Sequence, residues 1–137
     1  MKTKSSFVDS NVLIYAYSSN EAKKRTIALE LLSRNVIFST QVVNELVWVL
    51  SRKFQVKYPE LLSIVKYLSN NFEILTISPL TIERALGIQS DHLLSYWDAL
   101  MIASAIEGRC DFFFSEDMHN GLVIDKHLKI SNPFKKE

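Results

Sequence analysis

Cysteine, glycine and proline are scarce in this sequence of 137 residues, which contains one cysteine, three glycines and three prolines. The single cysteine, Cys110, excludes an internal disulfide and suits a reducing compartment, so we expect a small core residue there. No linker rich in serine, glycine or charge divides the chain, and nothing marks a domain boundary. The sequence therefore predicts one domain over residues 1–137, in a protein of the cytoplasm.

The sequence also lacks a large excess of positive or negative charge, and it lacks long apolar runs. Sixteen basic and fifteen acidic residues leave a formal net charge of +1, so no overall field attracts nucleic acid or an anionic membrane. No run approaches the ~20 apolar residues of a membrane span, and no apolar stretch near the N-terminus predicts a signal peptide. Any contact with RNA must then come from a local patch.

Short apolar strands alternate with helical patterns along the chain. Strands are expected at Phe7–Val8, Val36–Phe38, Phe72–Ile77 and Phe112–Phe114, with weaker candidates at Leu122–Ile124 and Leu128–Ile130. Helices are expected at 21–32, at 41–54 with Thr40 as N-cap, at 59–68, from Ser78-Pro79 onward, and from Ser95 to Gly108. The apolar segment Val12–Tyr17 either continues the first strand or forms a short helix.

This alternation predicts an α/β fold: a three-layer α/β/α domain with a central, mainly parallel sheet of about five strands. In such sheets, ligands bind beyond the carboxyl ends of the strands. Acidic residues lie at these places, directly after a buried strand or close to the start of an apolar helix. They are Asp9, Glu45, Asp98, Glu116 and Asp117.

Each of these acids also has an ordinary explanation, and the residues alone leave both open. Asp9 has the character of a helix N-cap, and Asp98 completes the spacing of a capping box that starts at Ser95. Glu45 is consistent with a solvated helix residue, and the acids at 116–117 are consistent with turn residues.

A cluster of these acids would have a definite chemistry. Carboxylates within about 4 Å of one another repel by several kcal/mol, so a cluster persists only with protonation or a bound cation. Oxygen ligands without cysteine or paired histidine select Mg²⁺ or Mn²⁺. The three histidines, His92, His119 and His127, show no ligand spacing and are expected on the surface or in turns.

An acidic magnesium site positions water and stabilises the charge on a phosphodiester during hydrolysis. Small polar residues beside the acids would orient a ligand, a water or a phosphate, although each also fits a cap or a turn. They are Ser10, Asn11, Asn44 and Ser115. A phosphatase that uses a DxD nucleophile is excluded, because Asp9-Ser10-Asn11 has no second acid.

Four segments, in this order, resemble the PIN-domain family, in particular the VapC-type toxin ribonucleases of type II toxin-antitoxin pairs. The segments are Phe7–Tyr15, Val43–Leu46, Ser95–Ala105 and Phe114–Asp117, and Ser131–Phe134 is similar to the usual ending of the family. The resemblance implies that Asp9, Glu45 and Asp98 bind metal. It places the fourth acid at Asp117, while Glu116 either shares the metal or faces outward.

The resemblance further implies a Mg²⁺- or Mn²⁺-dependent endoribonuclease, a homodimer, and inhibition by a small antitoxin whose tail covers the active-site groove. The alternative is a PIN-like module that binds RNA or a partner protein without cutting. Scattered basic residues, including the run at 23–25, are candidates for phosphate contacts, but none is assigned that role.

Overall fold

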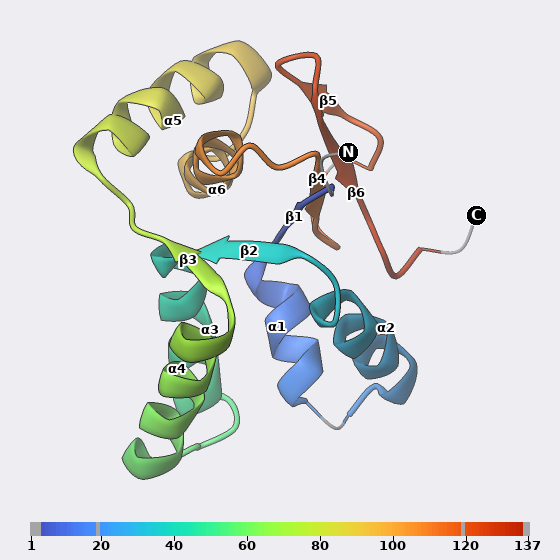
Figure 1. Cartoon of the computed structure of the whole chain (residues 1–137), viewed down its shortest axis with the longest axis vertical. Helices are drawn as coiled ribbons and strands as arrows, with labels where there is room; N and C mark the ends of the chain where they lie inside the picture. Colours follow the sequence, from blue (N-terminus) through green and yellow to red (C-terminus); the bar gives the residue numbers. More distant parts are fainter. Residues whose placement is uncertain (1–3, 19, 119, 136–137) are drawn as a thin grey trace.

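A central sheet with helices on both faces organises the chain in the computed structural model, which describes residues 4–18, 20–118 and 120–135 (Figure 1). The sheet has six strands in the order β3-β2-β1-β4-β6-β5. The strands are β1 (Ser6–Val8), β2 (Val36–Ser39), β3 (Glu73–Leu75), β4 (Phe112–Phe114), β5 (Val123–Ile124) and β6 (Leu128–Ser131). Neighbouring strands are parallel except β5 and β6, which pair antiparallel.

The mainly parallel three-layer architecture is therefore confirmed, with six strands in place of about five. Because β5 is only two residues long, it gives a weak sequence signal, and its pairing with β6 adds the sixth strand.

In the described part of the chain, six helices lie between β1 and β4 in sequence. They are α1 (Ser10–Tyr17), α2 (Ala22–Leu32), α3 (Thr40–Arg52), α4 (Tyr58–Asn71), α5 (Pro79–His92) and α6 (Tyr96–Glu107). In Figure 1, α5 and α6 lie on one side of the β1–β3 part of the sheet, and α1 to α4 lie on the other. Both faces of the sheet are thus covered, as is usual for parallel strands.

Two sequence expectations are refined at helix starts. The open choice at 12–17 is settled as a helix, because α1 begins directly after β1. The predicted cap Thr40 is wrong by one position: Ser39 is the N-cap of α3 and Thr40 is its first residue. The Thr40 hydroxyl instead accepts a hydrogen bond from the Ile77 N–H at 3.3 Å, which ties α3 to the segment after β3.

The core runs along β1, β2 and β4 and under α6. The rings of Phe7 and Phe113, on neighbouring strands, stack with centroids 5.2 Å apart, and both are fully buried. Seven consecutive residues of α6, 99–105, are buried, so this helix is central as expected. Cys110 is buried in the same core, as predicted.

Within the described residues, none of the helices has the length and apolar character needed to cross a membrane. Of the histidines, His92 ends α5 and His127 is exposed and paired with Asp111 at 2.8 Å. His119 lies outside the described residues.

Candidate active site

Asp9 lies at the carboxyl end of β1, beside the end of β4. The two strands run parallel with Val8 opposite Phe114, so the residues that follow them come together. The Asp9 N–H donates to the Phe114 carbonyl at 2.9 Å. The Ser115 hydroxyl donates to Asp9 Oδ2 at 2.7 Å, and Oδ1 accepts from the Ser10 N–H at 2.6 Å. Asp9 is therefore the N-cap of α1 and part of a polar cluster at once.

The Asp9 carboxyl is only 5% exposed. Burial raises the pKa of Asp9 to about 6, the hydrogen bonds from Ser115 and Ser10 oppose this rise, and the charge of Glu45 adds to it. A buried carboxylate near a second one is costly when ionised, so this position favours a cation or a proton.

Glu45 lies in the second turn of α3 and reaches Asp9 through a bridging hydroxyl. Ser10 Oγ donates to Glu45 Oε2 at 2.8 Å and lies 3.2 Å from Asp9 Oδ1. Gln41, one turn earlier, donates Nε2 to Glu45 Oε1 at 3.1 Å and to the Trp97 carbonyl at 3.0 Å. Sequence reasoning missed Gln41 as a site residue, although its spacing of four residues from Glu45 was the available signal.

Asp117 joins the cluster from the loop after β4. Asn11 Nδ2 donates to Asp117 Oδ2 at 3.2 Å and lies 3.5 Å from Asp9 Oδ2. Ser115 Oγ accepts from the Asp117 N–H at 3.2 Å. Ser115 and Asn11 thus connect Asp117 to the buried Asp9.

Asp98 lies in the first turn of α6. Its N–H donates to Ser95 Oγ at 3.1 Å, so Ser95 is the N-cap of α6 and supplies one of the two hydrogen bonds of the capping box considered from the sequence. Burial raises the pKa of Asp98, a side-chain hydrogen bond from Ser95 to its carboxyl opposes the rise, and the charge of Asp117 adds to it. Asp98 therefore lies in the capped first turn of α6, and its carboxyl is affected by the charge of Asp117.

Glu116 points to different partners. Its carboxylate accepts a hydrogen bond from the Tyr15 hydroxyl at 2.5 Å and forms an ion pair with Lys24 at 2.5 Å. Partial burial raises the pKa of Glu116, but the hydrogen bonds from Lys24 and Tyr15 outweigh it and hold the pKa below the usual value. Neither Lys24 nor Tyr15 was expected at the site, because each is distant in sequence from Glu116.

Two open depressions flank the acids. A groove of about 740 Å³ is lined by α3, the start of α6 and Ile77, and it includes Gln41, Glu45 and the exposed Asn44. A second depression of about 410 Å³ includes Asn11, Glu116 and Asp117. Glu45 therefore borders one depression, and Glu116 and Asp117 border the other.

Among the described residues, no three His, Cys, Asp or Glu side chains are close enough together to hold a metal ion as they stand. The Ser10 hydroxyl bridges Asp9 and Glu45, and the Asn11 amide bridges Asp9 and Asp117, while Asp98 is coupled to Asp117 only through the effect of its charge. The residues present nevertheless suit a hard cation, since the donors are oxygens. Asn11 Oδ1 is a further buried oxygen, with no hydrogen-bond partner in the described part of the chain.

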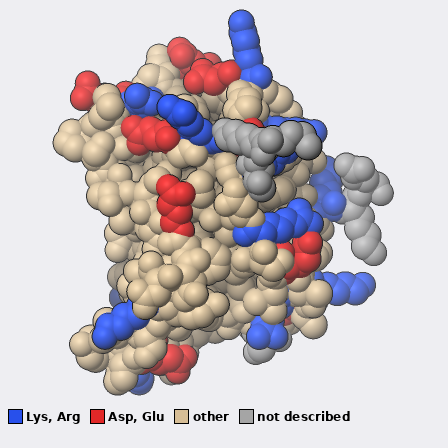
Figure 2. Space-filling view, viewed as in Figure 1, with Lys and Arg blue, Asp and Glu red and all other residues tan. Residues whose placement is uncertain are grey.

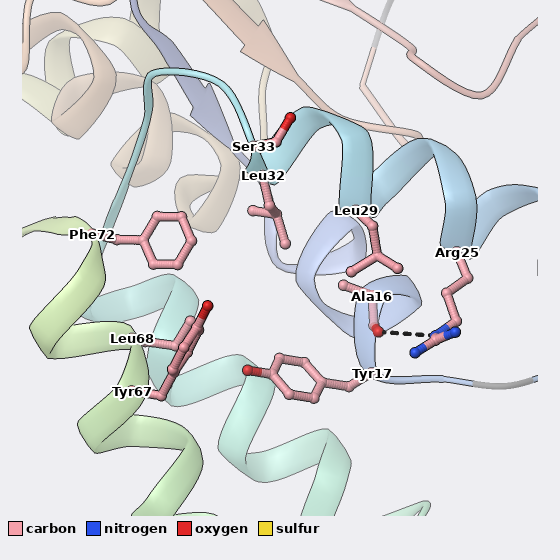
Figure 3. Close-up of a pocket in the computed structure, with 9 residues that line it drawn as sticks. All are labelled: Ala16, Tyr17, Arg25, Leu29, Leu32, Ser33, Tyr67, Leu68 and Phe72. Carbon is pink, nitrogen blue, oxygen red and sulfur yellow. Dashed lines mark hydrogen bonds between the residues drawn. The ribbon is translucent and has the colours of Figure 1, made fainter.

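A separate apolar groove of about 500 Å³ lies between α1, α2 and α4, away from the acids. Figure 3 shows Leu29, Leu32 and Phe72 around this space and the ring of Tyr17 pointing toward Tyr67. Arg25 borders it and donates Nε to the Ala16 carbonyl at 3.3 Å. On the face drawn in Figure 2, acidic and basic side chains are interspersed around a broad uncharged area, so no region of one sign dominates there.

Comparisons with known proteins agree with this architecture. The family model for the PIN domain matches residues 6–119. No curated protein matches the sequence significantly. A toxin-antitoxin complex from Klebsiella pneumoniae is similar over 96% of this chain and 99% of its own, with 20% identity and a TM-score of 0.70.

Two further solved structures show the same likeness. The VapBC2 complex of Rickettsia felis, bound to a DNA fragment from its promoter, is 18% identical, with a TM-score of 0.66 over 93% of this chain and 98% of its own. The VapC20 toxin of Mycobacterium tuberculosis, which cleaves the sarcin-ricin loop, is 19% identical, with a TM-score of 0.65 over 82% of this chain and 91% of its own. At these identities the likeness establishes a shared fold.

Proposed function

Because this chain belongs to the PIN domain family, we propose that it is a Mg²⁺- or Mn²⁺-dependent endoribonuclease that hydrolyses RNA phosphodiester bonds in the cytoplasm. One observation carries the proposal: the buried carboxylate of Asp9 is joined to Glu45 through Ser10 and to Asp117 through Asn11. These bridges link acids from three separate segments at the end of the sheet. The similarity to the Mycobacterium tuberculosis toxin, which cleaves the sarcin-ricin loop, supports RNA as the substrate class.

The proposed metal ligands are Asp9, Glu45, Asp98 and Asp117. When bound there, Mg²⁺ or Mn²⁺ would activate water and offset the charge on the phosphodiester. Ser10 and Ser115 fix the orientation of the Asp9 carboxylate, and their hydrogen bonds favour its ionised form. We place Glu116 outside this set, because Lys24 and Tyr15 already occupy its carboxylate.

Substitution of the acids tests the proposal. Purified protein should cleave structured RNA only with added Mg²⁺ or Mn²⁺, and Asp9→Asn or Asp98→Asn should lower the rate by more than about 100-fold, beyond the loss of an outer partner. The control is Asp91→Asn, which removes an exposed carboxylate from α5 and should leave the rate unchanged.

Circular dichroism checks that the variants fold. Metal-independent cleavage, or full activity in both site variants, contradicts the mechanism. Binding of RNA without cleavage under any metal condition would instead identify a non-catalytic PIN-like module.

We further propose that the chain is the toxin of a toxin-antitoxin pair, because the similar structures include a toxin-antitoxin complex from Klebsiella pneumoniae and a toxin from Mycobacterium tuberculosis. The groove between α1, α2 and α4 lies away from the acids and would hold a second part of such a partner, besides the tail expected over the active-site groove, since its apolar lining and bordering Arg25 fit an amphipathic segment with an acidic residue. Expression should arrest growth, and co-expression of a short neighbouring reading frame should relieve the arrest. Absence of relief contradicts the toxin role and leaves the nuclease proposal intact.

The chain is also proposed to form a homodimer. Trp48 and Trp97 are 60% and 64% exposed and line the same 740 Å³ groove, together with Ile77 and Leu100. Large exposed apolar side chains grouped in this way mark protein interfaces. A second copy covering this face would bring two acidic sites near each other.

A further inference from the structure

Lys24, Tyr15 and Glu116 form a compact cluster beside the acidic site, with each residue on a different element. The Lys24 ammonium pairs with the Glu116 carboxylate and donates to the Tyr15 hydroxyl at 3.1 Å. The Tyr15 hydroxyl in turn donates to Glu116 Oε1. Helices α1 and α2 are thereby joined to the loop that follows β4.

Residues near the C-terminus also contact this cluster. Asn132 Nδ2 lies 3.4 Å from the Glu116 carbonyl oxygen and donates to it. The Phe134 ring packs edge-on against Tyr15 with centroids 5.0 Å apart. The Lys24 ammonium lies 4.8 Å from the centroid of the Tyr15 ring and 6.0 Å from that of Phe134.

These contacts fix the backbone immediately before Asp117. The Asp117 side chain is exposed, and the contact that holds its carboxylate is the hydrogen bond from Asn11. Its position therefore depends on the backbone of the loop. Ser115 fixes the loop on one side of Glu116, while Lys24, Tyr15 and Asn132 hold Glu116 itself.

We propose that Lys24 and Tyr15, acting through Glu116, are positioning residues that hold Asp117 in place for metal binding, and that Glu116 itself is not a metal ligand. The inference rests on the proposed metal site. Removal of any one of the three groups releases the loop while leaving the ligands Asp9, Glu45 and Asp98 intact.

The affinity for Mn²⁺, measured by electron paramagnetic resonance on the full chain without RNA, tests this directly. Lys24→Met removes a positive charge, so Coulomb attraction alone would strengthen Mn²⁺ binding. If Lys24 instead positions Asp117, Lys24→Met should weaken Mn²⁺ binding. We expect the dissociation constant for Mn²⁺ to rise about 10–100-fold, which is the usual effect of losing a residue that orients a metal ligand. Lys23→Met, an exposed neighbour on α2, is the matched control for charge and should not weaken binding.

A charge exchange separates positioning from ligation at residue 116. Glu116→Lys alone should weaken Mn²⁺ binding, and Lys24→Glu combined with Glu116→Lys should restore affinity to within about threefold by reforming the ion pair. If Glu116 were a metal ligand, the double variant would bind Mn²⁺ as weakly as Glu116→Lys does. That result would overturn the inference. Tyr15→Phe, which removes one hydroxyl, keeps the test possible if the charge variants fail to fold.

Asp9→Asn distinguishes the two proposals. If it leaves Mn²⁺ binding unchanged, the metal site itself is wrong. If it abolishes binding while Lys24→Met binds Mn²⁺ as tightly as the wild type, only the positioning role is wrong. Weaker RNA binding by Lys24→Met with unchanged Mn²⁺ affinity would assign Lys24 to a phosphate contact and also overturns the inference.

Discussion

Asp9 has two roles with opposite effects on its acidity. As the N-cap of α1 it accepts hydrogen bonds that favour the carboxylate, whereas burial at the end of β1 disfavours it. Burial has the larger effect, and the pKa rises from 3.8 to about 6. The sequence indicated both the cap and the site; the structure confirms the cap, and the role of Asp9 in a metal site stays a prediction.

This shift makes stability depend on pH. Between pH 4 and 6 the folded state binds more protons at Asp9 than the unfolded state, so the free energy of unfolding falls as pH rises through this range. Asp9→Asn removes the titrating group. The free energy of unfolding, measured with urea in the presence of a chelator, should depend less on pH in the variant than in the wild type. Above pH 7 it should be about 1–3 kcal/mol higher in the variant. An unchanged pH slope would show that Asp9 is not the cause, and Asp91→Asn is the control.

At the scale of elements, strands and helices follow directly from apolar patterning, while their ends do not. Ser39 and Thr40 are both good caps by composition, and only the backbone decides that Ser39 is extended and Thr40 helical. The helix α6 was recognised from its apolar run and its bounding Ser95 and Gly108, and the structure confirms both limits. Local patterns thus predict which elements form better than where they begin.

Two glycines offer a matched test of element stability. Gly87 lies inside α5, and a Cβ there meets no atom within 4 Å, so Gly87→Ala should raise the free energy of unfolding by about 0.5–1 kcal/mol. Gly121 has a φ of +93°, which alanine adopts poorly, so Gly121→Ala should lower the free energy of unfolding by about 1 kcal/mol or more. Thermal unfolding of both variants measures the difference. A stabilising Gly121→Ala would contradict the assigned backbone conformation.

For the whole molecule, the sheet order brings distant acids together. Asp9 and Ser115 are neighbours because β1 and β4 pair in parallel, which the alternation of strands and helices made predictable. The pairing of Glu116 with Lys24 was not predictable, because it depends on how α2 packs beside the loop after β4. The sequence therefore predicts where the site lies, but not which polar groups bridge its acids.

The exposed tryptophans give a prediction at this scale. Trp48→Glu places a charge on the face that a second copy is proposed to cover. The dissociation constant of the dimer, measured by sedimentation equilibrium, should rise by about 10-fold or more. Tyr58→Glu, at a 72% exposed aromatic on α4, is the control and should leave the association unchanged. A wild-type protein that sediments as a monomer contradicts the dimer itself.

The central place of β1 in the sheet also has a consequence during synthesis. β1 is made early, yet one of its two neighbours, β4, begins only at Phe112. The Asp9 N–H finds its acceptor at Phe114, so the polar cluster forms only when most of the chain has left the ribosome. A growing chain shorter than this holds Asp9 and Glu45 without Ser115 and Asp117, and we expect it to be inert toward RNA while it is translated.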